Sequence, residues 1–430
     1  MVQQLHVVIV GAGPAGLAAA LALTRQPPPD VRVRVTILEL RPAPGTLGGA
    51  INMTPLALRY LDSLGCGANV RGAGSNTSVL DMLSLRTGSI IAGLWPNAGN
   101  MRVGRQTIVE SMLDALAEQP SEGLAIRFGV TVKTIEHVGD DDGDGCVRVY
   151  LHDAASSRDE TLEGDVLLGC DGIHSFVRSS FVEPGREKMF SGRVGAYGYV
   201  DVTTPGDAEL VRADGAPAVG DTTMISGRAG HLLVTFFDKP RARLYLAAVL
   251  HRAQDRKSEE AREGWRVVGS DKQGLKRDIL ALFSGGQVKG LEGLLDRCEE
   301  WYFFPVYMLP PRGVWSKGRV LLLGDAAHAM PPQGESTGIA IEDGVLFAHV
   351  FSRCATRSVR RLMSDYEALR REQVEKVYSQ TVWSWKQGGT TASWLGNVVM
   401  EWLTTAVVYV MNWRQGDHFA RDVTKMELPE

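Results

Sequence analysis

The segment HVVIVGAGPAGLAAALAL at residues 6–23 constrains the fold most strongly. A short β-branched strand runs directly into Gly11, Gly13 and Gly16, and an alanine-rich helix follows. The first glycine permits a tight turn, the second lets the backbone approach a pyrophosphate, and the third lets helix and strand pack closely. This pattern predicts the opening βα unit of a Rossmann-like sheet.

A second predicted strand, VRVRVTILEL, carries Glu39 near its end, about 20 residues beyond the last glycine of the motif. A carboxylate at this place accepts hydrogen bonds from a ribose and repels a 2′-phosphate. Together with the glycines it predicts a cofactor that contains ADP. The motif alone does not separate NAD from FAD.

Two later segments bring further carboxylates to strand ends. Asp171 follows the apolar run in GDVLLGCDGIHSFVR, and Asp325 follows the run in LLLGDAAHAMPPQGESTGIAIEDG. Because crossover connections bring distant parallel strands together, the strand ends near residues 11, 171 and 324 are expected at one edge of the sheet. The PPQGESTG stretch leaves N–H groups free at a helix start, which suits an anion or an electron-rich ring.

Composition limits the class of protein. A chain of 430 residues is too long for one comfortable core, so two domains are expected. The formal net charge of -4 gives no reason to expect a nucleic-acid partner. The five cysteines are far apart and include no C-x-x-C pair, so no disulfide framework or metal site is expected, and a reducing cytoplasm fits best. No secretory signal is expected either.

The segment TASWLGNVVMEWLTTAVVYVMNW at residues 391–413 is long enough for a membrane span but carries a polar stripe. Glu401, Thr405 and Asn412 belong to this stripe, which predicts a helix packed against the protein, with a membrane interface or a partner surface as the alternative. Core anchors are expected at the tryptophans in or beside it, Trp383, Trp385, Trp394, Trp402 and Trp413.

Three motifs carry a family resemblance: GAGPAG with the later LEL and Arg41, then GCDGIHSFVR, then GDAAHAMPPQGESTGIAIEDG. In this order and spacing they resemble the FAD-dependent aromatic-ring hydroxylases, single-component flavoprotein monooxygenases similar to salicylate and p-hydroxybenzoate hydroxylases. The resemblance runs from about residue 5 to 370. It implies an α/β fold with a Rossmann-like FAD-binding domain, a discontinuous β-sheet substrate domain and C-terminal helices.

The resemblance also implies which residues bind FAD. In chain order they are Gly11, Gly13, Ala15, Gly16, Glu39, Arg41, Gly49, Ala50, Arg105, Asp171, Asp325, Pro332, Gly334, Ser336, Thr337 and Gly338. Glu39 would bind the adenosine end, Asp171 would serve both FAD and NAD(P)H, and Asp325 would bind ribityl or pyrophosphate oxygens. Pro332 would lie by the isoalloxazine ring. The family often has G-x-G-x-N where this chain has GESTG, so the tuning of the flavin is expected to differ.

The implied domains are discontinuous. The FAD-binding domain is expected at 1–75, 100–180 and 302–370, the substrate domain at 76–99 and 181–301, and a helical region at 371–430. In the substrate domain, TTMISGRAGHLLVTFFD and RARLYLAAVL are typical of hairpin strands, and a charged helical stretch follows from about 256 to 300.

Substrate contacts are expected from GRVGAYGYVDV in this second domain. The family frequently has an Arg after the aromatic residue there, whereas Gly198 follows Tyr197 in this chain. Arg193 and Tyr197 are the candidate catalytic or substrate-contacting residues.

The resemblance implies that NAD(P)H, as a transient co-substrate, and O2 are used to hydroxylate or epoxidise an electron-rich aromatic, indole-type or polyketide small molecule through a C4a-hydroperoxyflavin. Such chemistry is typical of secondary metabolism. The alternatives are a flavin oxidase or reductase, and a non-catalytic carrier resembling the GDP-dissociation inhibitors. Substrate identity, the choice of NADH or NADPH, and oligomeric state are left open.

Overall fold

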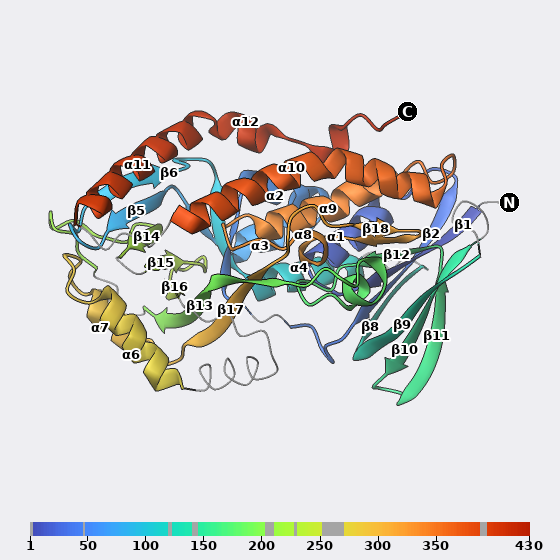
Figure 1. Ribbon diagram of the computed structural model, residues 1–430, viewed down its shortest axis with the longest axis horizontal. Coiled ribbons are helices and arrows are strands. Elements are labelled where there is room, and N and C mark those ends of the chain that lie inside the picture. The colour runs from blue at the N-terminus through green and yellow to red at the C-terminus, as the bar shows by residue number, and fades with distance from the viewer. Residues whose placement is uncertain are drawn as a thin grey trace.

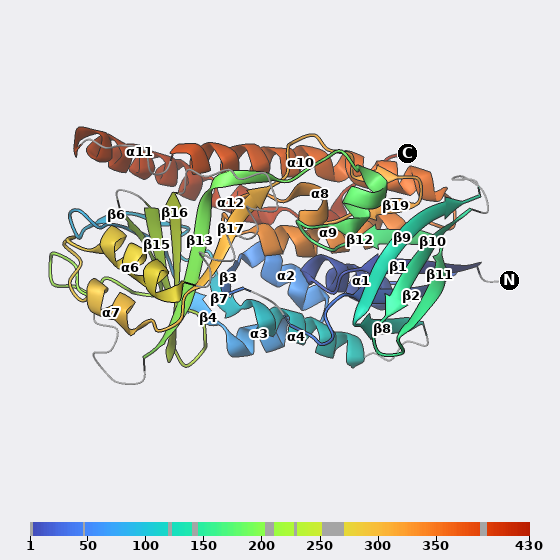
Figure 2. The same cartoon turned by 60° about the horizontal axis from the view of Figure 1, so that its bottom comes forward.

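Two units built around sheets lie end to end, and long helices run along one side of both (Figures 1 and 2). This computed structural model describes residues 3–45, 48–118, 123–139, 145–202, 210–227, 230–251, 271–387 and 394–430. Within these residues both units are assembled from segments that are far apart in the sequence, as expected.

The first unit is built on a six-stranded sheet with the order β18-β19-β12-β1-β2-β8. Its strands are β18 (Ser316–Lys317), β19 (Val320–Leu322), β12 (Val166–Gly169), β1 (Gln3–Val10), β2 (Val31–Glu39) and β8 (Leu124–Phe128). All but β18 pair in parallel. Helices cover parallel strands on both faces, which explains why these strands are nearly continuous apolar runs in the sequence.

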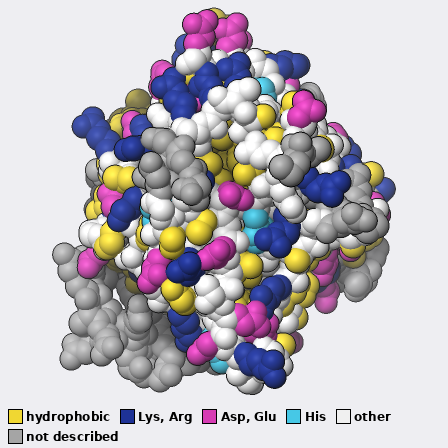
Figure 3. All heavy atoms as spheres, turned by 90° about the vertical axis from the view of Figure 1, so that its right-hand side faces the viewer, with side chains coloured by type: hydrophobic (Ala, Val, Ile, Leu, Met, Phe, Trp, Pro, Cys, Tyr) yellow, Lys and Arg dark blue, Asp and Glu magenta, His cyan; other side chains and the backbone are white. Residues whose placement is uncertain are grey.

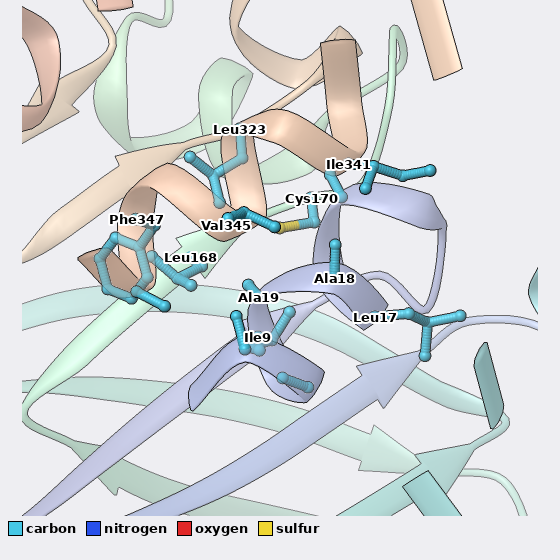
Figure 4. Packing of buried hydrophobic residues seen from close by; sticks show 14 of the residues in the cluster. Ile9, Leu17, Ala18, Ala19, Leu168, Cys170, Leu323, Ile341, Val345 and Phe347 are labelled. Atoms are coloured by element: carbon cyan, nitrogen blue, oxygen red, sulfur yellow. The ribbon is translucent and has the colours of Figure 1, made fainter. Parts of the chain in front are cut away.

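The core of this unit lies between the sheet and two helices, α1 (Pro14–Arg25) and α9 (Ser336–Phe351). Small side chains let the helices approach closely, and Figure 4 shows Ala18 and Ala19 of α1 near Val345 and Ile341 of α9. A Cβ added at Gly344 would lie 2.5 Å from the Ala19 nitrogen, so this crossing requires glycine.

Smaller elements complete the first unit. Its other helices are α2 (Pro55–Ser63), α3 (Gly67–Ala73), α4 (Arg105–Ala117), the short α8 (Asp325–His328) and the π-helix η1 (Arg178–Val182). One three-stranded sheet contains β3 (Ala50–Met53), β7 (Asn100–Gly104) and β4 (Ser75–Thr77). Another contains β11 (Arg158–Gly164), β10 (Cys146–Asp153) and β9 (Val130–Val138).

The second unit is a seven-stranded sheet with the order β17-β13-β16-β15-β14-β5-β6. Its strands are β17 (Tyr302–Met308), β13 (Met189–Asp201), β16 (Arg243–His251), β15 (Gly230–Phe236), β14 (Thr222–Ser226), β5 (Leu80–Ser84) and β6 (Ile90–Leu94). Successive side chains along each strand point to opposite faces of this sheet. Leu244, Leu246, Ala248 and Leu250 join a core with α6 (Lys272–Phe283) and α7 (Leu291–Arg297), while the residues between them face the first unit.

The predicted hairpin strands are confirmed, and one domain boundary differs from the sequence prediction. β17 pairs with β13, so residues 302–308 belong to the second sheet and not to the first unit. The pairing joins strands about 100 residues apart, which local sequence patterns do not reveal. The predicted helical stretch corresponds to α6 and α7, and residues 252–270 lie outside the described residues.

The C-terminal region consists of α10 (Val359–Gln387), α11 (Trp394–Trp413), α12 (Gln415–Ala420) and the 3-10 helix η2 (Val423–Lys425). α10 begins before residue 371, the expected start of the helical region. Within the described chain, no helix has the length and apolar character that crossing a bilayer demands.

The polar stripe of α11 faces the protein, which confirms that this helix packs on the chain. Glu401 accepts hydrogen bonds from Ser84 Oγ and Arg86 Nη2, both at 2.6 Å, and Asn412 Nδ2 donates to the Gly93 carbonyl at 2.8 Å. Val408 of the same helix is buried, whereas Trp402, Tyr409 and Trp413 are exposed.

The expectation of tryptophan core anchors is wrong for three residues of this region. The side chains of Trp383, Trp402 and Trp413 are 56%, 75% and 80% exposed. Trp402 and Trp413 lie on α11, where Glu401 and Asn412 bind the edge of the second sheet and leave these two rings exposed, whereas Trp383 lies on α10. The side chain of Trp394 lies outside the described residues.

At the end of the molecule formed by the β9–β11 sheet, basic and acidic side chains are interspersed among the described residues (Figure 3). This mixture agrees with the small formal net charge of -4. Opposite charges that lie side by side produce a weak field at a distance.

Candidate functional site

The three predicted strand ends lie side by side, because β19, β12 and β1 are neighbours in the parallel sheet. Gly11 has a φ of +107°, and a Cβ there would lie 2.5 Å from the Cys170 carbonyl oxygen. A Cβ at Gly16 would lie 2.2 Å from the Gly11 carbonyl oxygen. These two glycines therefore serve the turn and the packing of α1 on the sheet, as predicted.

Gly13 differs from both, since a Cβ added there would meet no atom within 4 Å. It precedes α1, whose first N–H groups receive no side-chain cap, and the buried Ala15 lies in the first turn. Gly13 also lines a hollow of ≈ 30 Å³ with Ala12, Glu39 and Arg41. An open helix start without a side-chain cap fits a phosphate-bearing ligand.

Two carboxylates border this edge of the sheet. Glu39 is buried and accepts hydrogen bonds from the Ala12 N–H at 2.8 Å and the Arg41 N–H at 3.0 Å. Asp171 Oδ2 accepts from the Val177 N–H at 3.1 Å, whereas its Oδ1 is buried without a partner among the described residues. Burial raises the pKa of Asp171. An unsatisfied buried oxygen is costly, so its presence fits a ligand that donates a hydrogen bond here.

A cavity of ≈ 2500 Å³ separates the two units. The predicted cofactor residues in its lining are Gly49, Ala50, Arg105, Asp325, Pro332, Gly334, Ser336 and Thr337. The opposite wall is the inward face of the seven-stranded sheet. Binding pockets for small molecules commonly have volumes of about 300–1,000 Å³, so this cavity has room for a flavin ring and a second molecule.

The loop between α8 and α9 borders the cavity. α9 begins at Ser336 without a side-chain cap, so the N–H groups of its first turn are open to a ligand. Glu335 binds His418 of α12 instead, with 2.8 Å between Oε1 and Nε2. Gly338 has a packing role, because a Cβ there would lie 3.0 Å from Ala57 Cβ of α2.

A buried ionic network fixes the end of β19. Asp343 accepts hydrogen bonds from the Gly324 N–H and from His328 Nε2, both at 2.7 Å, and from Arg370 Nε at 2.6 Å. Burial alone would raise the pKa of Asp343, but the charge of Arg370 and the hydrogen bonds lower it to about 2. His328 is therefore a buried histidine with a satisfied hydrogen bond, and Asp325 is held one residue beyond the anchored Gly324.

Tyrosines form the cavity wall that faces the predicted cofactor residues. Tyr197 stacks on Tyr302 with 5.1 Å between ring centroids. Tyr245 packs directly on Gly49, where a Cβ would lie 1.9 Å from the ring. Burial raises the pKa of both Tyr197 and Tyr245. Their phenols are consequently neutral at physiological pH and offer hydroxyl groups and ring faces, not a base.

Arg193 lines the cavity but is also bound to α10. Its Nη2 donates to the Trp385 carbonyl, and its guanidinium lies over the Trp385 ring at 4.7 Å from the centroid. Arg193 therefore joins β13 to the end of α10, and its contact with substrate stays a prediction.

Sequence reasoning missed two buried cavity residues, Arg102 and Tyr245. Arg102 lies three residues before Arg105 in a strand of alternating character, and Tyr245 lies in a predicted hairpin strand. The alternation of β16 could have placed Tyr245 opposite the core leucines of that strand, but no local signal shows which sheet faces Arg102.

Comparison with known proteins identifies the family. A model described as FAD binding domain matches residues 4–260 and 312–381. Salicylate hydroxylase from Pseudomonas putida is 30% identical over 390 residues, covering 88% of this chain and 84% of that protein. This chain belongs to the FAD-dependent aromatic-ring hydroxylases. The family resemblance is thereby confirmed.

Other comparisons agree with this assignment. The FAD-dependent monooxygenase ntnJ from a Nectria species is 28% identical to this hydroxylase over 393 residues, covering 88% of this chain and 83% of that protein. A solved salicylate hydroxylase substrate complex has the same fold, with a TM-score of 0.74, 18% identity, and coverage of 98% of this chain and 96% of that chain. The hydroxylase is thus an FAD-dependent monooxygenase, and the carrier and oxidase alternatives are not favoured.

Proposed function

We propose that this hydroxylase transfers one oxygen atom from O2 to a bulky, electron-rich aromatic compound, with NAD(P)H as the reductant. The balanced reaction consumes substrate, O2, NAD(P)H and a proton, and it yields the hydroxylated or epoxidised product, water and NAD(P)⁺. The observation that carries the proposal is the large cavity between the predicted cofactor residues and a wall of tyrosines.

In this proposal FAD lies along the edge where β1, β12 and β19 end. The open start of α1 at Gly13 would bind the pyrophosphate, and Glu39 would bind the adenosine ribose, exchanging its present backbone partners for hydroxyl groups. Asp171 and Asp325 would accept hydrogen bonds from the rest of the dinucleotide. Bound FAD supplies the redox chemistry with O2, while the protein supplies orientation and a dry cavity.

The substrate would lie between the α8–α9 loop and the tyrosine wall. Tyr197 and Tyr302 offer ring faces for stacking, and the neutral Tyr245 hydroxyl offers a hydrogen bond. Exclusion of water from such a site prevents loss of the activated oxygen to side reactions. Arg193 would contact the substrate from β13, where one of its nitrogens also donates to the Trp385 carbonyl.

The test is consumption of NADH and NADPH by the FAD-loaded protein with a panel of phenols, indoles and aromatic polyketides. We expect substrate-dependent consumption and a product heavier by one oxygen atom. The cavity volume predicts that multi-ring compounds are accepted more readily than salicylate. Consumption that yields only hydrogen peroxide across the panel would argue for an oxidase.

A further inference from the structure

Arg102 is a buried cation that has no hydrogen-bond or ion-pair partner among the described residues. Its side chain is 6% exposed and lines the cavity, and its Nε is buried without a hydrogen-bond partner.

The other buried arginines of the described chain are bound. Arg370 pairs with Glu342 and Asp343. Arg178 donates to the Ala326 and Ile173 carbonyls, and Arg193 donates to the Trp385 carbonyl. A buried guanidinium without such partners destabilises a protein, and this cost is most simply offset by a ligand.

The surroundings of Arg102 define the kind of ligand. It lies in β7, paired with Asn52 of β3 on one side and with Ser75 of β4 on the other. Asn52 Cβ is 3.9 Å from the position of a Cβ added at Gly334, so the strand next to Arg102 borders the α8–α9 loop. Burial lowers the pKa of Arg102 to about 10, and the nearby Tyr245, a neutral phenol, opposes this shift only in part.

We propose that Arg102 binds an oxyanion of the substrate, so that the hydroxylase selects acidic aromatic compounds that carry a carboxylate, phenolate or enolate. The planar guanidinium matches such delocalised anions with two parallel hydrogen bonds. Tyr245 lies beside it and donates a further hydrogen bond to the same anion. This proposal rests on the cavity being the substrate site of the proposed monooxygenase.

Direct binding to the FAD-loaded protein tests the proposal without turnover. The probes are 2-naphthoate and its neutral isostere 2-naphthamide, and binding is followed by the perturbation of the flavin absorbance spectrum. Wild-type protein is expected to prefer naphthoate roughly ten- to hundredfold, and Arg102→Gln is expected to abolish this preference. Arg102→Lys should retain part of it, because it keeps the charge but not the two-pronged geometry.

Thermal stability separates a ligand site from a structural residue. Arg102→Met should leave the melting temperature of the substrate-free, FAD-loaded protein unchanged or higher, because it removes an unpaired buried charge. A matched substitution at a bound arginine, Arg178→Met, should lower it by several degrees. A comparable fall for Arg102→Met would overturn the proposal.

Other outcomes also count against it. Equal affinity for the two probes, or no naphthoate binding up to its solubility limit, overturns substrate anion binding. A loss of FAD affinity or a lowered flavin reduction potential in Arg102→Gln, with the naphthoate preference intact, would assign the cation to the flavin instead. If naphthoate is preferred but no compound is oxygenated, the anion site stands and the proposed monooxygenase function fails.

Discussion

Gly13 precedes α1 and Gly16 lies in its first turn, and a methyl group would affect the two positions differently. Gly16→Ala is expected to destabilise the fold, because its Cβ would lie 2.2 Å from the Gly11 carbonyl oxygen. Gly13→Ala should fold normally, since its Cβ meets no protein atom within 4 Å, but should bind FAD at least about tenfold more weakly if the pyrophosphate lies there. Urea unfolding of the apoprotein and FAD titration measure the two effects. Full FAD affinity in Gly13→Ala would contradict the proposed pyrophosphate position.

Asp325 tests the other end of the proposed FAD site. Its side chain lines the cavity at the start of α8, and Asp325→Ala would remove the charge-assisted hydrogen bond that we propose it makes to the dinucleotide. The dissociation constant for FAD is expected to rise roughly ten- to hundredfold. Asp296→Ala, which changes a carboxylate that is 73% exposed, is the matched control. An unchanged constant in Asp325→Ala would show that this assignment is wrong.

At the scale of elements, buried ion pairs connect α9 and α10. Glu342 and Asp343 of α9 bind Arg370 of α10, and Arg421 binds Glu342 from beyond α12. Asp343→Asn leaves the other charges of this buried network unbalanced, and a loss of about 3–5 kcal/mol in unfolding free energy is expected. Chemical denaturation at neutral pH measures it. A loss below about 1 kcal/mol would mean that the network tolerates the missing charge.

The same network predicts an acid dependence. The pKa of Asp343 falls from 3.8 to about 2 on folding, so its contribution is complete above pH 4 and is lost as the pH falls toward 2. The shift corresponds to about 2 kcal/mol. The wild-type protein should therefore lose more stability between pH 4 and pH 2 than Asp343→Asn does. Parallel loss in the two proteins would contradict the assignment.

Among the described residues of α11, Glu401, Thr405 and Asn412 bind the edge of the second sheet. Glu401→Ala combined with Asn412→Ala removes its hydrogen bonds to Ser84, Arg86, Gly93 and Trp95. Faster amide hydrogen exchange is expected within residues 398–412, with little change in global stability. Tyr409→Ala, at a side chain that is 75% exposed, should leave exchange unchanged. Equal exchange in all three proteins would show that the apolar contacts hold this helix.

The sequence was informative where function depends on local spacing. The glycine motif and the two later strand ends predicted the neighbouring strands β1, β12 and β19, because each motif is a strand, a turn and a helix in succession. It was uninformative where distant segments meet. In the sequence Arg102 is an ordinary strand residue, and only the folded chain brings it close to Tyr245 of another sheet. No local pattern predicts that β17 pairs with β13. The exposure of Trp402 and Trp413 likewise depends on which strand edge binds the polar residues of α11.

At the scale of the whole molecule, the cavity couples the two units. Glu335 beside the α8–α9 loop binds His418, so the C-terminal helices contact the proposed flavin environment. Substrate that fills the cavity would bias this loop, and a bias of about 3–4 kcal/mol would accelerate flavin reduction several hundredfold. Stopped-flow reduction of the FAD-loaded protein by NADPH and by NADH, with and without an accepted substrate, measures the effect. Equal rates would argue against gating by substrate.

The order of strands in the seven-stranded sheet has an evolutionary consequence. Because β5 and β6 come from an early part of the chain, β13 to β16 from the middle and β17 from a later part, neither unit is a contiguous module. Gene recombination could not exchange this sheet for that of a relative without cutting the FAD-binding unit as well. New chemical preferences would arise in such a lineage by point substitutions on the inward sheet face and around β7.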